Sequence, residues 1–221
     1  MDRKINVFGI DITILTAKET MKLIMQYLEK ETVNTIEIVT LAMLMKEKDD
    51  EIWREQVEKF DLVLPGEKTL FEASEECDRN LVKELENRTF LRMFLRYLCK
   101  NKKRLFLLAD STERLALMRE QLRSYAHGAV VAGHAILPAD GGLEENVINE
   151  INGVEPDCIL SALPSPRGEQ FVVESGALLN ARLWVGGLSV FSEEITRRPL
   201  GKIRQFIMKK IFCYQVEKQK Q

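Results

Sequence analysis

Hydrophobic positions along the chain follow two alternating patterns. Short runs of consecutive apolar residues are typical of buried strands, whereas longer stretches place apolar residues at the spacing of a helix with one buried face. The strand-like runs cover residues 5–14, 36–40, 60–64, 104–109, 130–131, 157–163 and 182–185. The helical stretches begin at Thr16 and recur over residues 50–59, 69–86, 89–101, 115–125, 143–152, 169–179 and from 200 onward.

This alternation predicts an α/β fold. A strand, a helix and a further strand form a parallel crossover unit, so we expect a Rossmann-like, mostly parallel sheet of about six strands with helices on both faces. Thr16 with Glu19, and Asp110 with Glu113, have the spacing of capping boxes at two helix starts. Residues 5–14 fit either one strand or a small hairpin that is broken near Gly9.

The ends of the predicted strands are the places to look for a ligand. Sheets of this kind bind ligands beside the carboxyl ends of their strands. The strand ends that carry turn or polar residues lie at Thr40, Pro65, Asp110, residues 163–169 and residues 185–187.

The charge of the chain is unevenly distributed. It has 32 basic and 34 acidic residues, a net charge of −2, which argues against a general nucleic-acid binder. From Arg197 onward, however, eight residues are basic and only Glu217 is acidic. This tail also has apolar residues at helical spacing, so we expect a C-terminal amphipathic helix that either rests on an anionic membrane surface or docks on the protein itself.

The chain offers little for metal binding or membrane insertion. Its four cysteines are widely spaced and no two form a CxxC pair, so we expect no metal site and a reducing, cytoplasmic environment. The longest strongly apolar stretch, residues 38–45, falls far short of the roughly 20 residues that cross a bilayer. We therefore expect a protein that is soluble or peripheral on the inner face of the cell membrane.

Several common enzyme motifs are absent from the sequence. It has no GxGxxG after a strand, no GxxxxGK[ST] and no GxSxG. These absences argue against the usual dinucleotide-binding, P-loop and hydrolase-elbow enzymes. An enzyme built from this chain would depend on carboxylates, arginines and backbone donors.

An ordered set of short segments resembles the WecG/TagA/CpsF family of bacterial glycosyltransferases, from about residue 7 to residue 199. The similar segments are FGIDITILTAKET from Phe8, IVT from Ile38, FDLVLP from Phe60, KKRLFLLA from Lys102, VVAG from Val130, INGVEPDCILSALPSPRGE from Ile151 and WVGGLSVF from Trp184, followed by RRP from Arg197. The resemblance implies transfer of an N-acetylhexosamine-type sugar from a UDP-sugar to a polyprenyl-diphosphate-linked acceptor, in cell-wall or surface-polysaccharide synthesis, without a cofactor.

The sequence departs from the family at several polar positions. Ala42 stands where the family has an asparagine, and Gly66 stands where it has the aspartate proposed as its base. Gly168 replaces the family's glutamine, while Glu169 after it is kept. These departures leave two functions open: a glycosyltransferase, or a catalytically degenerate paralogue that acts as a binding or regulatory module for another transferase.

Two candidate residues carry over as catalyst and phosphate clamp. Glu67 is the carboxylate nearest to the lost aspartate, and it is our candidate base for the acceptor hydroxyl, the alternative being a solvated turn residue. Arg197 matches the family's arginine and can grip a diphosphate with two N–H donors, the alternative being a surface arginine.

Three further residues are candidates for substrate binding. Thr40 can donate a hydrogen bond to a ligand or cap the next helix. Glu169 matches a family position at the nucleotide, but a glutamate in a first helical turn also suits the helix dipole. Gly186 allows a ligand to approach the backbone closely or serves a tight turn. We assign residues 1–196 to the transferase-like domain and residues 197–221 to the basic appendage; the oligomeric state stays open.

Overall fold

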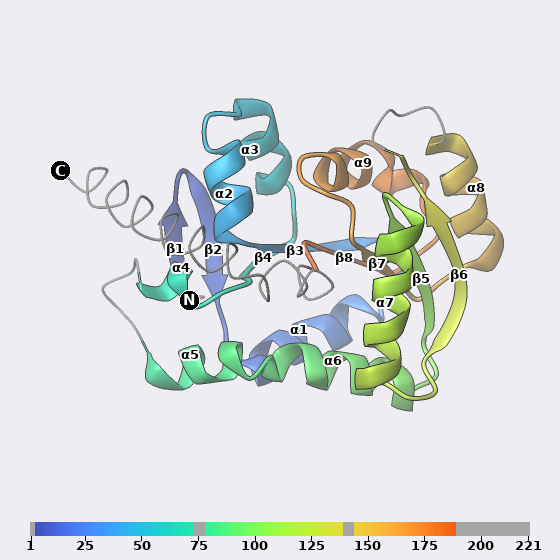
Figure 1. Ribbon diagram of the computed structural model, residues 1–221, viewed down its shortest axis with the longest axis horizontal. Helices are drawn as coiled ribbons and strands as arrows, with labels where there is room; N and C mark the ends of the chain where they lie inside the picture. Colours follow the sequence, from blue (N-terminus) through green and yellow to red (C-terminus); the bar gives the residue numbers. More distant parts are fainter. Residues whose placement is uncertain (1–2, 73–77, 139–143, 189–221) are drawn as a thin grey trace.

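The computed structural model describes residues 3–72, 78–138 and 144–188 (Figure 1). It is an α/β fold, as predicted, built on a six-stranded sheet in which every neighbouring pair of strands is parallel. The strand order is β4-β3-β8-β7-β5-β6. The bounds are β3 Asn34–Val39, β4 Leu62–Pro65, β5 Arg104–Ala109, β6 Val130–Ile136, β7 Cys158–Ser161 and β8 Leu183–Gly186.

Helices cover both faces of the sheet and bury a hydrophobic cluster on each. One cluster takes apolar residues from α1, α6 and α7, and the other takes them from α2, α3, α8 and α9. Figure 1 shows α1 and α6 below the sheet and α3 and α9 above it. The bounds are α1 Ala17–Tyr27, α2 Leu41–Glu47, α3 Glu51–Glu58, α4 Thr69–Glu72, α5 Arg79–Glu86, α6 Thr89–Lys100, α7 Thr112–Tyr125, α8 Glu144–Val154, α9 Arg167–Ser175 and the 3-10 turn η1 Gly176–Leu178.

The N-terminal segment forms a hairpin rather than one strand. Strands β1 (Arg3–Val7) and β2 (Ile10–Ile14) pair antiparallel outside the main sheet. Phe8 and Gly9 connect them, with φ angles of 52° and 85°. Two consecutive positive φ angles are typical of the tight turn whose twist matches that of the paired strands.

Helix starts agree with the sequence prediction at one capping box and differ at the other. At α1 the Thr16 hydroxyl accepts from the Glu19 backbone N–H, and the Glu19 carboxylate accepts from the Thr16 backbone, which confirms the predicted box. At α7 the prediction was wrong, because Ser111 rather than Asp110 caps the helix by accepting from Arg114 N. Asp110 instead forms an ion pair with the Arg114 side chain, at 2.9 Å.

The predicted basic appendage falls on residues outside the described ranges. The boundary at residues 196–197 and the amphipathic helix from residue 200 both lie in that part of the chain. Among the residues that are described, no helix combines the length and the apolar character needed to cross a membrane.

Candidate functional site

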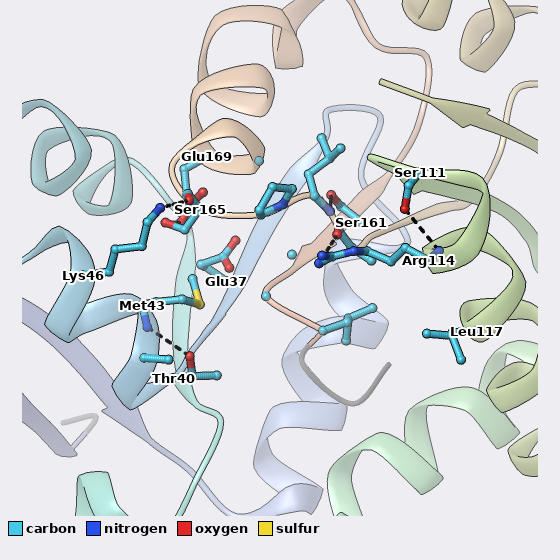
Figure 2. Close-up of a pocket in the computed structure, with 18 of the residues that line it drawn as sticks. Glu37, Thr40, Met43, Lys46, Ser111, Arg114, Leu117, Ser161, Ser165 and Glu169 are labelled. Atoms are coloured by element: carbon cyan, nitrogen blue, oxygen red, sulfur yellow. Dashed lines mark hydrogen bonds between the residues drawn. The ribbon is translucent and has the colours of Figure 1, made fainter. Parts of the chain in front are cut away.

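A cavity of about 510 Å³ lies where strands β3, β5, β7 and β8 end at their carboxyl sides (Figure 2). Its volume is in the range of small-molecule binding sites. The walls come from the residues after these strands and from α2, α7 and α9. Its polar lining includes Glu37, Thr40, Lys46, Ser111, Arg114, Ser165 and Glu169. Of the strand ends predicted from sequence, those at Thr40, Leu163 and Gly186 line this cavity.

Thr40 lines the cavity and also caps a helix. Its hydroxyl accepts a hydrogen bond from Met43 N, at 3.2 Å, and so satisfies one free N–H at the start of α2. The residue is 9% exposed. The cap orients the hydroxyl through its acceptor side, which leaves its proton as the donor available to a ligand.

Glu169 is a buried carboxylate rather than a solvated one. It lies in the first turn of α9 and is only 2% exposed. Its Oε1 accepts from Trp53 Nε1 at 2.8 Å and from Ser165 Oγ at 2.7 Å. These two donors satisfy Oε1, so the pair of bonds compensates part of the cost of burying a polar side chain.

Glu37 also lines the cavity, although the sequence analysis did not identify it. It lies within β3, is 2% exposed, and points into the cavity in Figure 2. Burial raises the pKa of its carboxyl group well above the ordinary value of 4.5, and the charge of Glu169 raises it further. The only signal in the sequence was a lone acidic residue inside an apolar strand, where a charge is rarely buried without a partner.

Two consecutive glycines make room for the Glu37 carboxyl group. A Cβ atom at Gly186 would overlap Oε2 of Glu37, and a Cβ atom at Gly187 would overlap both its Oε1 and the carbonyl oxygen of Ile38. Gly186 does permit a close approach to its backbone. Among the described residues, the group that approaches is the carboxyl group of Glu37, whereas the sequence analysis expected either a ligand or a tight turn.

The buried proton of Glu37 predicts a pH dependence of stability. Because its folded-state pKa is raised, its contribution is fully present below about pH 4.5 and is lost as the pH rises through the folded-state pKa. Glu37→Gln cannot ionise, so we expect this variant to exceed the wild type in free energy of unfolding by about 1–3 kcal/mol at alkaline pH and to differ less in acid.

Thermal unfolding followed by circular dichroism from about pH 5 to pH 9 measures this difference. The matched control is Glu120→Gln on the exposed side of α7. Parallel pH profiles for wild type and Glu37→Gln would contradict a protonated Glu37.

Glu67 lies beside the cavity, outside its lining. Its Oε1 accepts from the backbone N–H of Leu41, the first residue of α2, at 2.7 Å. Burial raises the pKa of the Glu67 carboxyl group, and the Leu41 hydrogen bond lowers it in part. Glu67 is therefore a half-buried, anchored carboxyl group next to Thr40 rather than a solvated turn residue. The predicted clamp, Arg197, lies outside the described residues, so its position relative to Glu67 stays a prediction.

Two cations on the cavity wall were not identified from sequence. Lys46 on α2 donates to the carbonyl oxygen of Ser165 at 2.8 Å. Arg114 on α7 contacts Asp110 through Nε and donates from Nη1 to the carbonyl oxygen of Ala162 at 3.3 Å. A guanidinium group has five N–H donors, so these contacts leave donors for an anionic ligand. In the part of the chain that is described, no cluster of three or more His, Cys, Asp or Glu side chains is arranged to hold a metal ion.

Comparison with models of protein families identifies a family. A family model described as "Glycosyl transferase WecG/TagA/CpsF family" matches residues 5–202 of the chain. The matched segment contains every residue of the cavity described above. None of the curated proteins matches the chain.

Proposed function

Because the chain belongs to the WecG/TagA/CpsF family of glycosyl transferases, we propose that it transfers an N-acetylhexosamine-type sugar from a UDP-sugar to a polyprenyl-diphosphate-linked acceptor. The product would serve cell-wall or surface-polysaccharide synthesis. The observation that carries this proposal is the cavity at the carboxyl ends of the strands, with carboxyl groups at Glu37 and Glu169 and cations at Lys46 and Arg114 on its wall.

The chemical requirements of the reaction match the groups that are present. Sugar transfer needs a base for the acceptor hydroxyl and positive charge for the departing diphosphate. Glu67 is the proposed base: its pKa is raised by burial, and its position beside the cavity leaves the donor pocket itself free. Arg114, together with Arg197 of the C-terminal segment, is proposed to stabilise the diphosphate. No cofactor is required for this chemistry.

The acceptor suggests a role for the basic tail. A polyprenyl-linked acceptor resides in a membrane, and we propose that the segment from Arg197 holds the protein against the anionic inner membrane surface. Its eight basic residues and single acidic residue support this proposal. Each basic residue near an anionic surface contributes roughly 1 kcal/mol at low salt.

A binding module without turnover is the second candidate. Ala42 lines the cavity at the position of the family's asparagine, and Gly66 occupies the position of its aspartate. The described residues nevertheless leave the cavity open, since Leu41 and Leu70 are buried in the core, while Leu188 lines its wall. This module would bind a UDP-sugar and leave the transfer to another enzyme.

Calorimetry with UDP-N-acetylglucosamine and UDP tests the donor site, and a UDP-release assay with a polyprenyl-diphosphate-linked acceptor tests turnover. We expect Arg114→Ala to weaken binding of both nucleotides by about tenfold, because the variant lacks the positive charge that is proposed to stabilise the diphosphate. The matched control is Arg119→Ala, on the same helix and outside the cavity lining. Equal binding by both variants would contradict the proposed donor orientation, and donor binding without turnover would favour the binding module.

A further inference from the structure

The two buried carboxyl groups of the cavity differ in their hydrogen-bond partners. Glu169 accepts from Trp53 Nε1 and Ser165 Oγ, both at Oε1, and these donors stabilise a negative charge there. Within the described ranges, no hydrogen bond to the Glu37 carboxyl group is found. Its surroundings are the backbone of Gly186 and Gly187, the nearby Trp184 Nε1, which is itself without a hydrogen-bond partner among the described residues, and the apolar core. The charge of such a pair therefore resides on Glu169, and the proton resides on Glu37.

Glu37 and Glu169 are positioned to contact the same ligand. Both side chains line the same cavity and are each 2% exposed. Figure 2 shows the Glu37 carboxyl group between the Ser165–Glu169 pair and the guanidinium group of Arg114. The other charged groups that line the cavity are Lys46 on α2 and Glu113 and Arg114 on α7.

The charges divide the cavity into two parts. A carboxylate at Glu169 repels a phosphate, so the part of the cavity beside Glu37 and Glu169 suits a neutral group with many hydroxyls. Lys46 lies on the same side as Glu169, where it donates to the carbonyl oxygen of Ser165 and forms an ion pair with Glu47. Arg114 lies on the other side of the Glu37 carboxyl group and attracts the phosphates to that part of the cavity. A neutral carboxyl group is a strong O–H donor, and a carboxylate is a strong acceptor, so together they match a sugar, which offers both donors and acceptors.

We propose that Glu37 and Glu169 form a carboxylic acid–carboxylate pair that binds the sugar of the donor, with the neutral Glu37 carboxyl group donating a hydrogen bond to a sugar oxygen. This inference rests on the proposed function for the identity of the ligand. It adds a sugar-binding residue, Glu37, that lies outside the motif segments through which the chain resembles its family, since those begin again at Ile38.

Calorimetry on the full chain at neutral pH separates the sugar from the nucleotide. We expect Glu37→Ala to weaken UDP-N-acetylglucosamine by about tenfold and to leave UDP unchanged within twofold, because only the sugar contacts Glu37. Glu37→Gln keeps a neutral N–H donor of the same size, so its affinity for both nucleotides should stay within about threefold of the wild type. An equal loss in Glu37→Gln and Glu37→Ala, or no loss in either, would overturn the proposal.

A second measurement needs no ligand and no substitution that risks folding. Carbon-13 NMR of the side-chain carboxyl groups, followed against pH, reports the charge of Glu37 directly. We expect Glu37 to be protonated at pH 7; an ionised Glu37 overturns the proposal while leaving the family function intact. If the wild type binds neither nucleotide, the proposed function fails by itself, and this titration still decides whether the acid–carboxylate pair exists.

Discussion

Gly187→Ala is expected to destabilise the protein by at least about 3 kcal/mol, which removes much of the stability of an ordinary domain. Gly187 has a φ angle of 62°, and a Cβ atom there would overlap the backbone carbonyl oxygen of Ile38. Backbone of β3 inside the sheet cannot move away cheaply, and a left-handed φ adds its own cost for alanine.

Gly186→Ala provides the matched comparison. Its Cβ atom would overlap the side chain of Glu37 instead of backbone. Removing that side chain should relieve the overlap, so we expect Glu37→Ala to restore more of the stability lost in Gly186→Ala than of that lost in Gly187→Ala, where the overlap with the Ile38 carbonyl oxygen and the positive φ angle remain. Chemical denaturation of the single and double variants measures the coupling directly. Wild-type stability in Gly186→Ala, or equal rescue of both glycine variants, would contradict the arrangement of Glu37 against the two glycines.

Glu67→Gln is expected to reduce turnover by about 100-fold or more while sparing UDP binding. A general base contributes about 10²- to 10⁴-fold to such a reaction, and glutamine cannot accept the proton. The variant should fold normally, because the amide oxygen of glutamine can still accept from Leu41 N as Glu67 Oε1 does. UDP release measured under saturating donor, beside calorimetry with UDP, separates turnover from binding.

The control for this variant is Glu55→Gln, an exposed residue on α3. Because burial raises the pKa of Glu67 above its ordinary value of 4.5, the wild-type rate should rise with pH as this group loses its proton. Full turnover in Glu67→Gln would show that another group takes the proton of the acceptor. A wild type that binds donor without turnover would assign the chain to the binding module.

Most of the fold was predictable because strands of a parallel sheet are buried on both faces and so appear as continuous apolar runs. Strand β5, Arg104–Ala109, was predicted with the bounds that the structure has. Helix α2 was not predicted as a separate element, because its apolar residues follow β3 after Thr40 alone and merge with it into one run over residues 38–45. The predicted capping residue of α7 was wrong by one position, because Asp110 and Ser111 are both good capping residues.

The candidate site was predictable only where it follows from the ends of strands. Thr40, Glu169 and Gly186 were identified in this way, and all three line the cavity. Glu37 was missed because its significance depends on Gly186, Gly187 and Glu169, which are remote in sequence and meet it only through the pairing of β3 with β8 and the packing of α9. Lys46 and Arg114 were missed because the periodicity of a sequence shows which residues share one face of a helix. It does not show which other parts of the protein that face contacts.

The central claim is that a UDP-sugar binds in the cavity at the carboxyl ends of β3, β7 and β8. Backbone NMR of the full chain, titrated with UDP-N-acetylglucosamine, tests it most directly. The account predicts saturable shift changes concentrated at Thr40, residues 161–165 and residues 186–188, with the Glu37 amide among them. Changes concentrated at the opposite edge of the sheet, around Arg104, Val130 and Leu183, or no saturable change at all, would contradict it.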